Sequence, residues 1–93
     1  MRKRKLSFHQ DDEKIKKLQT RKAEMIRSFI GIPVQISYNG DYRGEMKCTL
    51  SKIYSLDGFG WICEIDPKTV EIIEGPKEIR VMFVKNITNI KEV

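Results

Sequence analysis

The run Gly31-Ile32-Pro33 divides the sequence into a part that can be helical and a part that cannot continue that helix. Pro33 lacks an amide N–H, and Gly31 readily adopts the left-handed conformation that ends a helix. Upstream, apolar residues recur at helical spacings of three and four: Ile15, Leu18, Met25, Ile26, Phe29 and Ile30. We therefore expect an amphipathic helix over residues 11–30.

Two starting points for this helix fit the sequence. Asp11, Asp12 and Glu13 place three carboxylates where the helix dipole favours negative charge, and either aspartate can cap the first free N–H groups. The alternative start lies one turn earlier, because residues 7–10 match a capping box.

Residues 32–93 contain ten Ile and five Val but only two Leu, and such β-branched side chains favour strands. Alternation and turn residues predict a hairpin with a type I′ turn at Asn39-Gly40 and a second turn at residues 57–60. The expected strands are 34–38, 42–54, 61–65, 70–74 and 79–84, and residues 86–90 form a short last turn or strand.

Five strands joined by tight turns within sixty residues protect their edges best by curling into a small barrel. The expected fold is α+β, mainly β, with a five-stranded antiparallel barrel over residues 33–91. Ile26, Phe29 and Ile30 of the helix would plug one end of the barrel. Helix and barrel make a single domain over residues 11–93, preceded by a flexible basic arm over residues 1–10.

The positive charge is confined to the beginning of the chain. Residues 1–28 contain ten basic and four acidic residues, whereas residues 29–93 contain eight basic and nine acidic ones. This asymmetry is typical of an end that meets polyanions, although a solvated basic helix and tail can also serve only solubility. The candidate phosphate-binding residues are Arg2, Lys3, Arg4, Lys5, Lys14, Lys16, Lys17, Arg21, Lys22 and Arg43.

Four aromatic residues near the predicted turns are candidates for base stacking or protein docking: Tyr38, Tyr42, Phe59 and Trp61. The alternative is that Trp61 lies in the core and the tyrosines cap the barrel rim with their hydroxyls in water. Phe59 lies between Gly58 and Gly60, so it is the one of the four that we most expect to be exposed.

Residues suited to catalysis or to binding a metal or cofactor are few. His9 is the single histidine, and Cys48 and Cys63 lie in apolar strand-like segments, as expected of buried thiols in a reducing compartment. No catalytic or phosphate-loop motif is present. We therefore expect a cytoplasmic, non-enzymatic protein without metal, cofactor or membrane segment.

The segments IPVQISYNG and VMFVKNITNI, together with the preceding helix, resemble the Sm-like and SH3-like small-barrel superfamily. In outline the chain is most similar to the YolD-like proteins of Gram-positive bacteria and their phages, through residues 33–38 and 87–90. Residues 61–63 are more weakly similar to the Trp-Tyr-Leu signature of WYL domains, which are regulatory barrels that bind nucleic acid or nucleotide ligands.

Two functions fit these features. The first is a small regulatory or accessory protein that contacts nucleic acid, DNA included, through its basic arm and helix. The alternative is a phage-type inhibitor or adaptor whose nearly neutral barrel docks onto a larger bacterial enzyme. Self-association through strand edges is compatible with either function.

Overall fold

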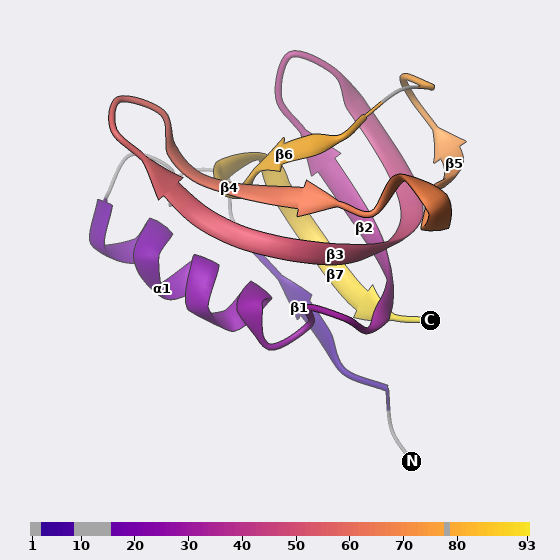
Figure 1. Cartoon of the computed structure of the whole chain (residues 1–93), viewed down its shortest axis with the longest axis horizontal. Coiled ribbons are helices and arrows are strands. Elements are labelled where there is room, and N and C mark those ends of the chain that lie inside the picture. Colours follow the sequence, from indigo (N-terminus) through magenta and orange to yellow (C-terminus); the bar gives the residue numbers. More distant parts are fainter. Residues whose placement is uncertain (1–2, 9–15, 78) are drawn as a thin grey trace.

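The protein is described by a computed structural model that covers residues 3–8, 16–77 and 79–93. One helix, α1 (Lys16–Arg27), accompanies an antiparallel sheet, and two short 3-10 turns are η2 (Pro67–Thr69) and η3 (Val84–Asn86) (Figure 1). The strands are β1 (Lys5–Ser7), β2 (Pro33–Asn39), β3 (Arg43–Leu56), β4 (Gly60–Ile65), β5 (Glu71–Glu74), β6 (Val81–Phe83) and β7 (Ile87–Glu92). This confirms the expected mainly β composition with one helix. No helix in the described ranges is long and apolar enough to cross a bilayer.

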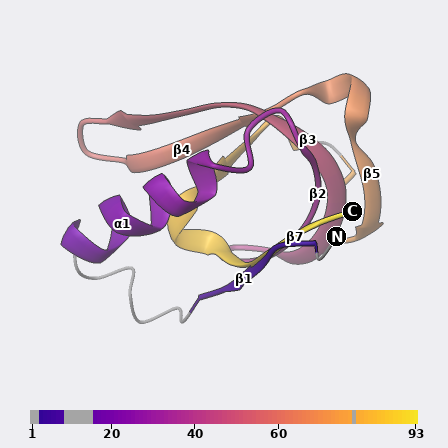
Figure 2. The ribbon, with the colours of Figure 1, turned by 90° about the horizontal axis from the view of Figure 1, so that it is seen from below.

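Strand β3 is the longest strand and pairs with three others. Its first half pairs with β2 and its second half with β4, while β5 pairs with the side of β3 that faces away from β2. The strand order is β1-β7-β2-β3-β4-β6, with β5 off this path. Figure 2 shows how far the long strand curves, so that the sheet wraps around its own interior.

The predicted closed barrel is not confirmed, because no ladder within the described residues joins the two ends of the sheet, β1 and β6. β6 is only three residues long, shorter than the predicted strand 79–84, and the chain leaves it through η3. The outer edge of β7 is paired with β1 instead.

The core follows the alternation expected from the sequence. Inward residues of β2 and β3 are fully or almost fully buried, and they meet Ile26 and Phe29 of α1. Ile30 is only partly buried, and Met25, predicted to lie on the apolar stripe, is 39% exposed.

The helix ends earlier than predicted. Beyond Arg27 the backbone tightens into a turn in which Phe29 N–H bonds the Ile26 carbonyl and Ile30 N–H bonds the Arg27 carbonyl. Gly31 then has φ +82°, which confirms its predicted left-handed conformation. The predicted first turn at residues 11–13 lies outside the described residues.

The predicted type I′ turn at Asn39-Gly40 is wrong. Neither residue has a positive φ, and Asn39 pairs with Arg43 across a three-residue loop. Glycine is needed at position 40 for another reason: a Cβ there would lie 2.5 Å from Nδ2 of Asn86.

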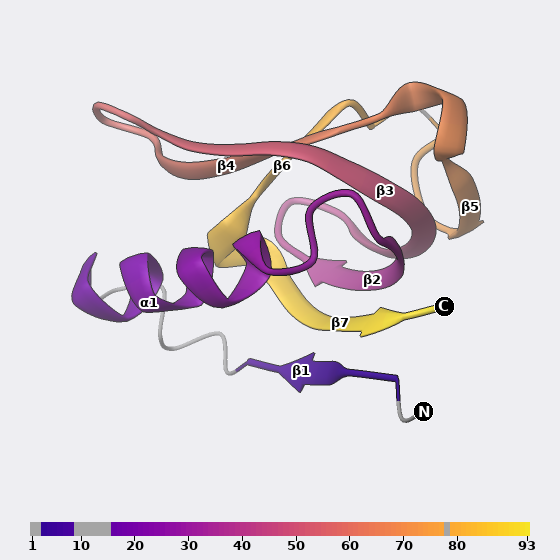
Figure 3. The ribbon, with the colours of Figure 1, turned by 60° about the horizontal axis from the view of Figure 1, so that its bottom comes forward.

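The flexible arm predicted over residues 1–10 is also incorrect for its central part. Lys5, Leu6 and Ser7 form β1 and pair with β7, and Phe8 N–H continues the contact by bonding the Thr88 carbonyl at 2.8 Å. Leu6 and Phe8 pack against the core, and the burial of their apolar side chains stabilises the pairing of this short basic segment with β7. Figure 3 shows β1 running beside β7.

Candidate nucleic-acid interface

A cleft of about 590 Å³ lies where α1 meets the hairpin that joins β3 to β4. We call it the junction cleft. In Figures 1 and 3 the hairpin extends beyond the body of the sheet and runs along α1. The cleft is lined by Gln19 and Thr20 of α1, by residues 55–61 of the hairpin and by Lys85 of η3.

The tip of the hairpin displays Phe59. Gly58 and Gly60 have φ values of +83° and +81°, a conformation that other residues rarely adopt, and they turn the chain sharply on both sides of the phenylalanine. Phe59 N–H bonds the Leu56 carbonyl at 3.0 Å, which closes the turn. As predicted, Phe59 is strongly exposed, at 64%, and the nearby Leu56 is 44% exposed. Single exposed apolar residues are common on protein surfaces, but apolar side chains that share one cleft, as these two do, are typical of binding sites.

Trp61 forms the wall of the cleft beneath Phe59. Its side chain is half-buried, and the indole Nε1 donates a hydrogen bond to Thr20 Oγ1 at 3.3 Å. The Arg27 guanidinium lies 5.7 Å from the centroid of the ring, within the range of a cation–π interaction. The indole is therefore fixed by two residues of α1 while part of its surface still faces the cleft.

Lys22 occupies a structural position. It is only 4% exposed, its amine donates to the Lys85 carbonyl at 3.4 Å, and the same amine lies 4.8 Å from the centroid of Phe8. These contacts bind α1 to η3 and to the segment after β1. The predicted phosphate contact of Lys22 therefore does not fit its burial.

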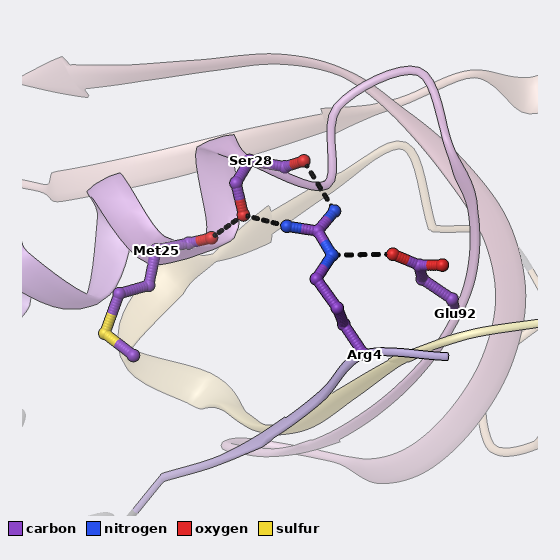
Figure 4. A network of polar contacts seen from close by, with 4 residues as sticks. All are labelled: Arg4, Met25, Ser28 and Glu92. Atoms are coloured by element: carbon purple, nitrogen blue, oxygen red, sulfur yellow. Dashed lines mark hydrogen bonds and ion pairs between the residues drawn. The ribbon is translucent and has the colours of Figure 1, made fainter. Parts of the chain in front are cut away.

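Arg4 is likewise held by the fold (Figure 4). Its Nε bonds Glu92 Oε1 at 2.6 Å, and its two terminal nitrogens bond the hydroxyl and the carbonyl of Ser28 at 3.0 and 2.9 Å. The guanidinium also lies 4.3 Å from the centroid of Phe29. Arg4 thus joins β1, β7 and the end of α1, and its three hydrogen bonds engage three of the five N–H donors of the guanidinium.

The other predicted site residues fall into distinct places. Lys3, Lys5 and Arg21 are exposed, and Arg43 is exposed at the β2–β3 loop, which Figure 1 places well away from α1. Arg2 and Lys14 lie outside the described residues. Lys16 and Lys17 belong to the first turn of α1, but their side chains are not described.

The two remaining aromatic candidates do not line the junction cleft. Tyr38 is 6% exposed, and its hydroxyl has no hydrogen-bond partner within the described part of the chain, so it neither stacks a base nor keeps a wet hydroxyl at a rim. Burial, followed by the charge of Glu74, raises the pKa of Tyr38. Tyr42 is 69% exposed but lies in the β2–β3 loop.

The two thiols are buried, as expected from their strands. Burial raises the pKa of Cys48 to about 12, and burial with the nearby Cys48 raises the pKa of Cys63 to about 12 as well. Both hold their protons at neutral pH and are poor nucleophiles there. Within the described ranges, no three His, Cys, Asp or Glu residues are close enough to share a metal ion.

The sequence alone did not single out Arg27 and Lys85, which lie at the candidate interface. Arg27 comes seven positions after Thr20, which places both on one face of the helix, and this spacing was a usable signal. Nothing in the sequence placed Lys85 near the hairpin tip, because η3 reaches the cleft only through the folding of β6 and β7. The chain matches no known family model, no curated protein and no solved structure.

Proposed function

We propose that this protein is a small, non-enzymatic nucleic-acid-associated accessory or regulatory protein that holds single-stranded nucleic acid in the junction cleft. The observation that carries the proposal is Phe59, displayed at 64% exposure on a cleft that also contains Trp61 and Lys85. Every base has a flat face that stacks on an aromatic ring, and such stacking contributes about 1–3 kcal/mol per base. An unpaired strand offers these faces, whereas a duplex keeps them stacked.

The charge around the cleft supports a polyanionic ligand. Lys85 lines the cleft, and the guanidinium of Arg27 lies 5.7 Å from the centroid of the Trp61 ring. Asp57 is the one carboxylate among the lining residues, and it is exposed to screening solvent at the hairpin tip. With Lys22 and Arg4 engaged in the fold, we assign the phosphate contacts to Lys85 and Arg21, which are exposed.

We also propose that the curved sheet is a variant of the Sm-like or SH3-like small barrel. The strand order β7-β2-β3-β4-β6, with a 3-10 turn between β6 and β7, supports this assignment. In this variant β1 occupies the outer edge of β7. The assignment concerns the fold and carries no function by itself.

The proposal is tested by titrating the protein with a deoxythymidine oligonucleotide of about twelve nucleotides and with a duplex of equal length. Trp61 is the single tryptophan, so its fluorescence reports on the cleft directly. We expect the single strand to quench Trp61 and to bind more tightly than the duplex, with affinity that falls as salt rises. Unchanged fluorescence at low salt, or affinity independent of salt, contradicts the proposal.

The lysine of the cleft offers a second readout. In Lys85→Gln, the slope of the logarithm of affinity against the logarithm of salt concentration should decrease in magnitude by about one, which corresponds to the loss of one phosphate contact. Arg43→Gln removes another exposed cation, at the distant β2–β3 loop, and serves as the control. Equal slopes for the two variants would show that phosphates do not lie near the cleft.

A further inference from the structure

Three strands leave one edge unpaired within the described residues: β1, β5 and β6. Natural proteins protect such edges with charged side chains, because an open edge invites another strand. β1 carries Lys5, and β5 carries Glu71 and Glu74. β6, with the sequence Val81-Met82-Phe83, carries no charge at all.

The backbone of β6 is oriented to accept a partner. Ile65 N–H bonds the Arg80 carbonyl at 2.9 Å, which makes this a hydrogen-bonded pair of the antiparallel ladder between β4 and β6. Such pairs alternate along a ladder, so Met82 with Cys63 is the next bonded pair and Val81 opposite Glu64 is not bonded. The N–H and C=O of Val81 therefore point away from β4, toward the open edge.

An apolar pocket of about 220 Å³ lies beside this edge, between β6 and the β2–β3 loop. Tyr42, which is 69% exposed, and Val81, which is 50% exposed, form its accessible walls together with Ile79 and Phe83. Asp41 is the one residue among the lining that is charged at neutral pH. The amine of Lys85 lies 5.5 Å from the centroid of Phe83, at the end of β6 farthest from Val81.

We propose that β6 and this pocket bind an extended segment of a partner protein, which adds a strand to the sheet beside Val81. An open strand edge is complementary to a polypeptide backbone, and the neighbouring pocket gives specificity by accepting one apolar side chain of the added strand. Asp41 favours a lysine or arginine on that segment by charge complementarity. Among the described residues the lining contains a carboxylate and no cation, which disfavours a nucleic acid here, and it shares no residue with the lining of the junction cleft.

The test uses a panel of synthetic octapeptides in which Val and Thr alternate around one central Phe, Leu or Tyr. Each peptide is made with a Lys and with a Glu next to the central residue. A matched set carries Pro in the strand, which prevents pairing. Binding is followed by amide chemical shifts in labelled protein and by hydrogen exchange of the Val81 amide.

We expect the alternating peptides to shift the amides of Val81, Phe83 and Tyr42 and to slow exchange at Val81 by about tenfold at saturation. The Lys peptide should bind about two- to fivefold more tightly than its Glu counterpart, as expected for an exposed ion pair. Asp41→Lys should invert this preference. Such an inversion would show that the variant is folded and that the charge at position 41 determines which peptide binds more tightly. Ile73 on the charged β5 edge is the internal control and should not shift.

Four results would each overturn the proposal. The first is the absence of shifts at Val81 across the whole panel of peptides. The second is binding of the Pro peptides as tight as that of the alternating peptides. The third is a shift at Val81 caused by an oligonucleotide. The fourth is protection of Val81 by concentration-dependent dimerisation, which would mean that a second copy of the chain occupies the edge. Apart from the oligonucleotide result, none of these outcomes bears on nucleic-acid binding, which is read from the fluorescence of Trp61 in the junction cleft.

Discussion

Replacing Arg4 with alanine should destabilise the fold and leave nucleic-acid affinity nearly unchanged. The side chain makes an ion pair with Glu92, two hydrogen bonds to Ser28 and a cation–π contact with the buried ring of Phe29. It is also 46% exposed, so each contribution belongs at the low end of its range. The ion pair and the cation–π contact then contribute about 0.5 kcal/mol each and the hydrogen bonds about 1 kcal/mol together.

These contributions predict a loss of about 2 kcal/mol in the free energy of unfolding, measured by urea denaturation followed by Trp61 fluorescence. For a chain of this size the melting temperature should fall by roughly 8–15 °C. Arg4→Lys keeps the charge but loses the forked donors and should lie between alanine and the native residue. A double-mutant cycle with Glu92→Gln should give a coupling of about 0.5 kcal/mol.

The neighbouring Lys3 provides the matched control, because it is exposed and basic. Lys3→Ala should change stability by less than about 0.5 kcal/mol. If Arg4→Ala is no more destabilising than Lys3→Ala, the contacts of Arg4 are not structural. If it instead weakens oligonucleotide binding far more than Lys3→Ala does, Arg4 is a phosphate contact, as the sequence had suggested.

Three further predictions concern the core. The pKa of about 12 for Cys48 and Cys63 exceeds their ordinary value of 9.0, so the native state retains protons that the unfolded chain loses above pH 9. The contribution of these thiols to the free energy of unfolding should be fully present below pH 9 and then fall by up to about 1.4 kcal/mol per pH unit for each thiol. In Cys63→Ala the fall should be less steep. Tyr38→Phe removes a buried hydroxyl without a partner among the described residues and should leave thermal stability equal or up to about 1 kcal/mol higher; a loss above 1 kcal/mol would reveal a partner. Gly44→Ala places a Cβ against the Tyr38 hydroxyl and the Glu74 carbonyl and should cost about 2–3 kcal/mol in urea unfolding, whereas a near-neutral change would mean that β3 and β5 separate easily.

Much of the fold was predictable because local patterns and tertiary structure agree. The left-handed conformation of Gly31 and the alternation through β2 and β3 depend on residues close in sequence, and the structure bears them out. Strand β1 could not be predicted in this way. Three residues of mixed polarity carry no strand signal, and their partner β7 lies more than eighty residues away. The predicted closure of the sheet into a barrel is not confirmed for a related reason, since the outer edge of β7 pairs with β1.

The candidate site was predictable in its aromatic part and not in its charged part. Two flanking glycines are enough to predict an exposed Phe59. Counting charges cannot distinguish a cation that faces solvent from one that the fold uses, and Arg4 and Lys22 both proved to be of the second kind. Their partners, Glu92 and the Lys85 carbonyl, become neighbours only in the folded chain.

The most direct test of nucleic-acid binding in the junction cleft compares the affinity of Phe59→Ala and Tyr42→Ala for the deoxythymidine oligonucleotide. Both residues are exposed aromatics in loops, at 64% and 69%, so truncating either should leave the fold intact. If a base stacks on Phe59, Phe59→Ala weakens binding by about tenfold or more, the equivalent of one lost base stack, while Tyr42→Ala binds like the native protein. Equal affinities for the two variants would contradict such stacking.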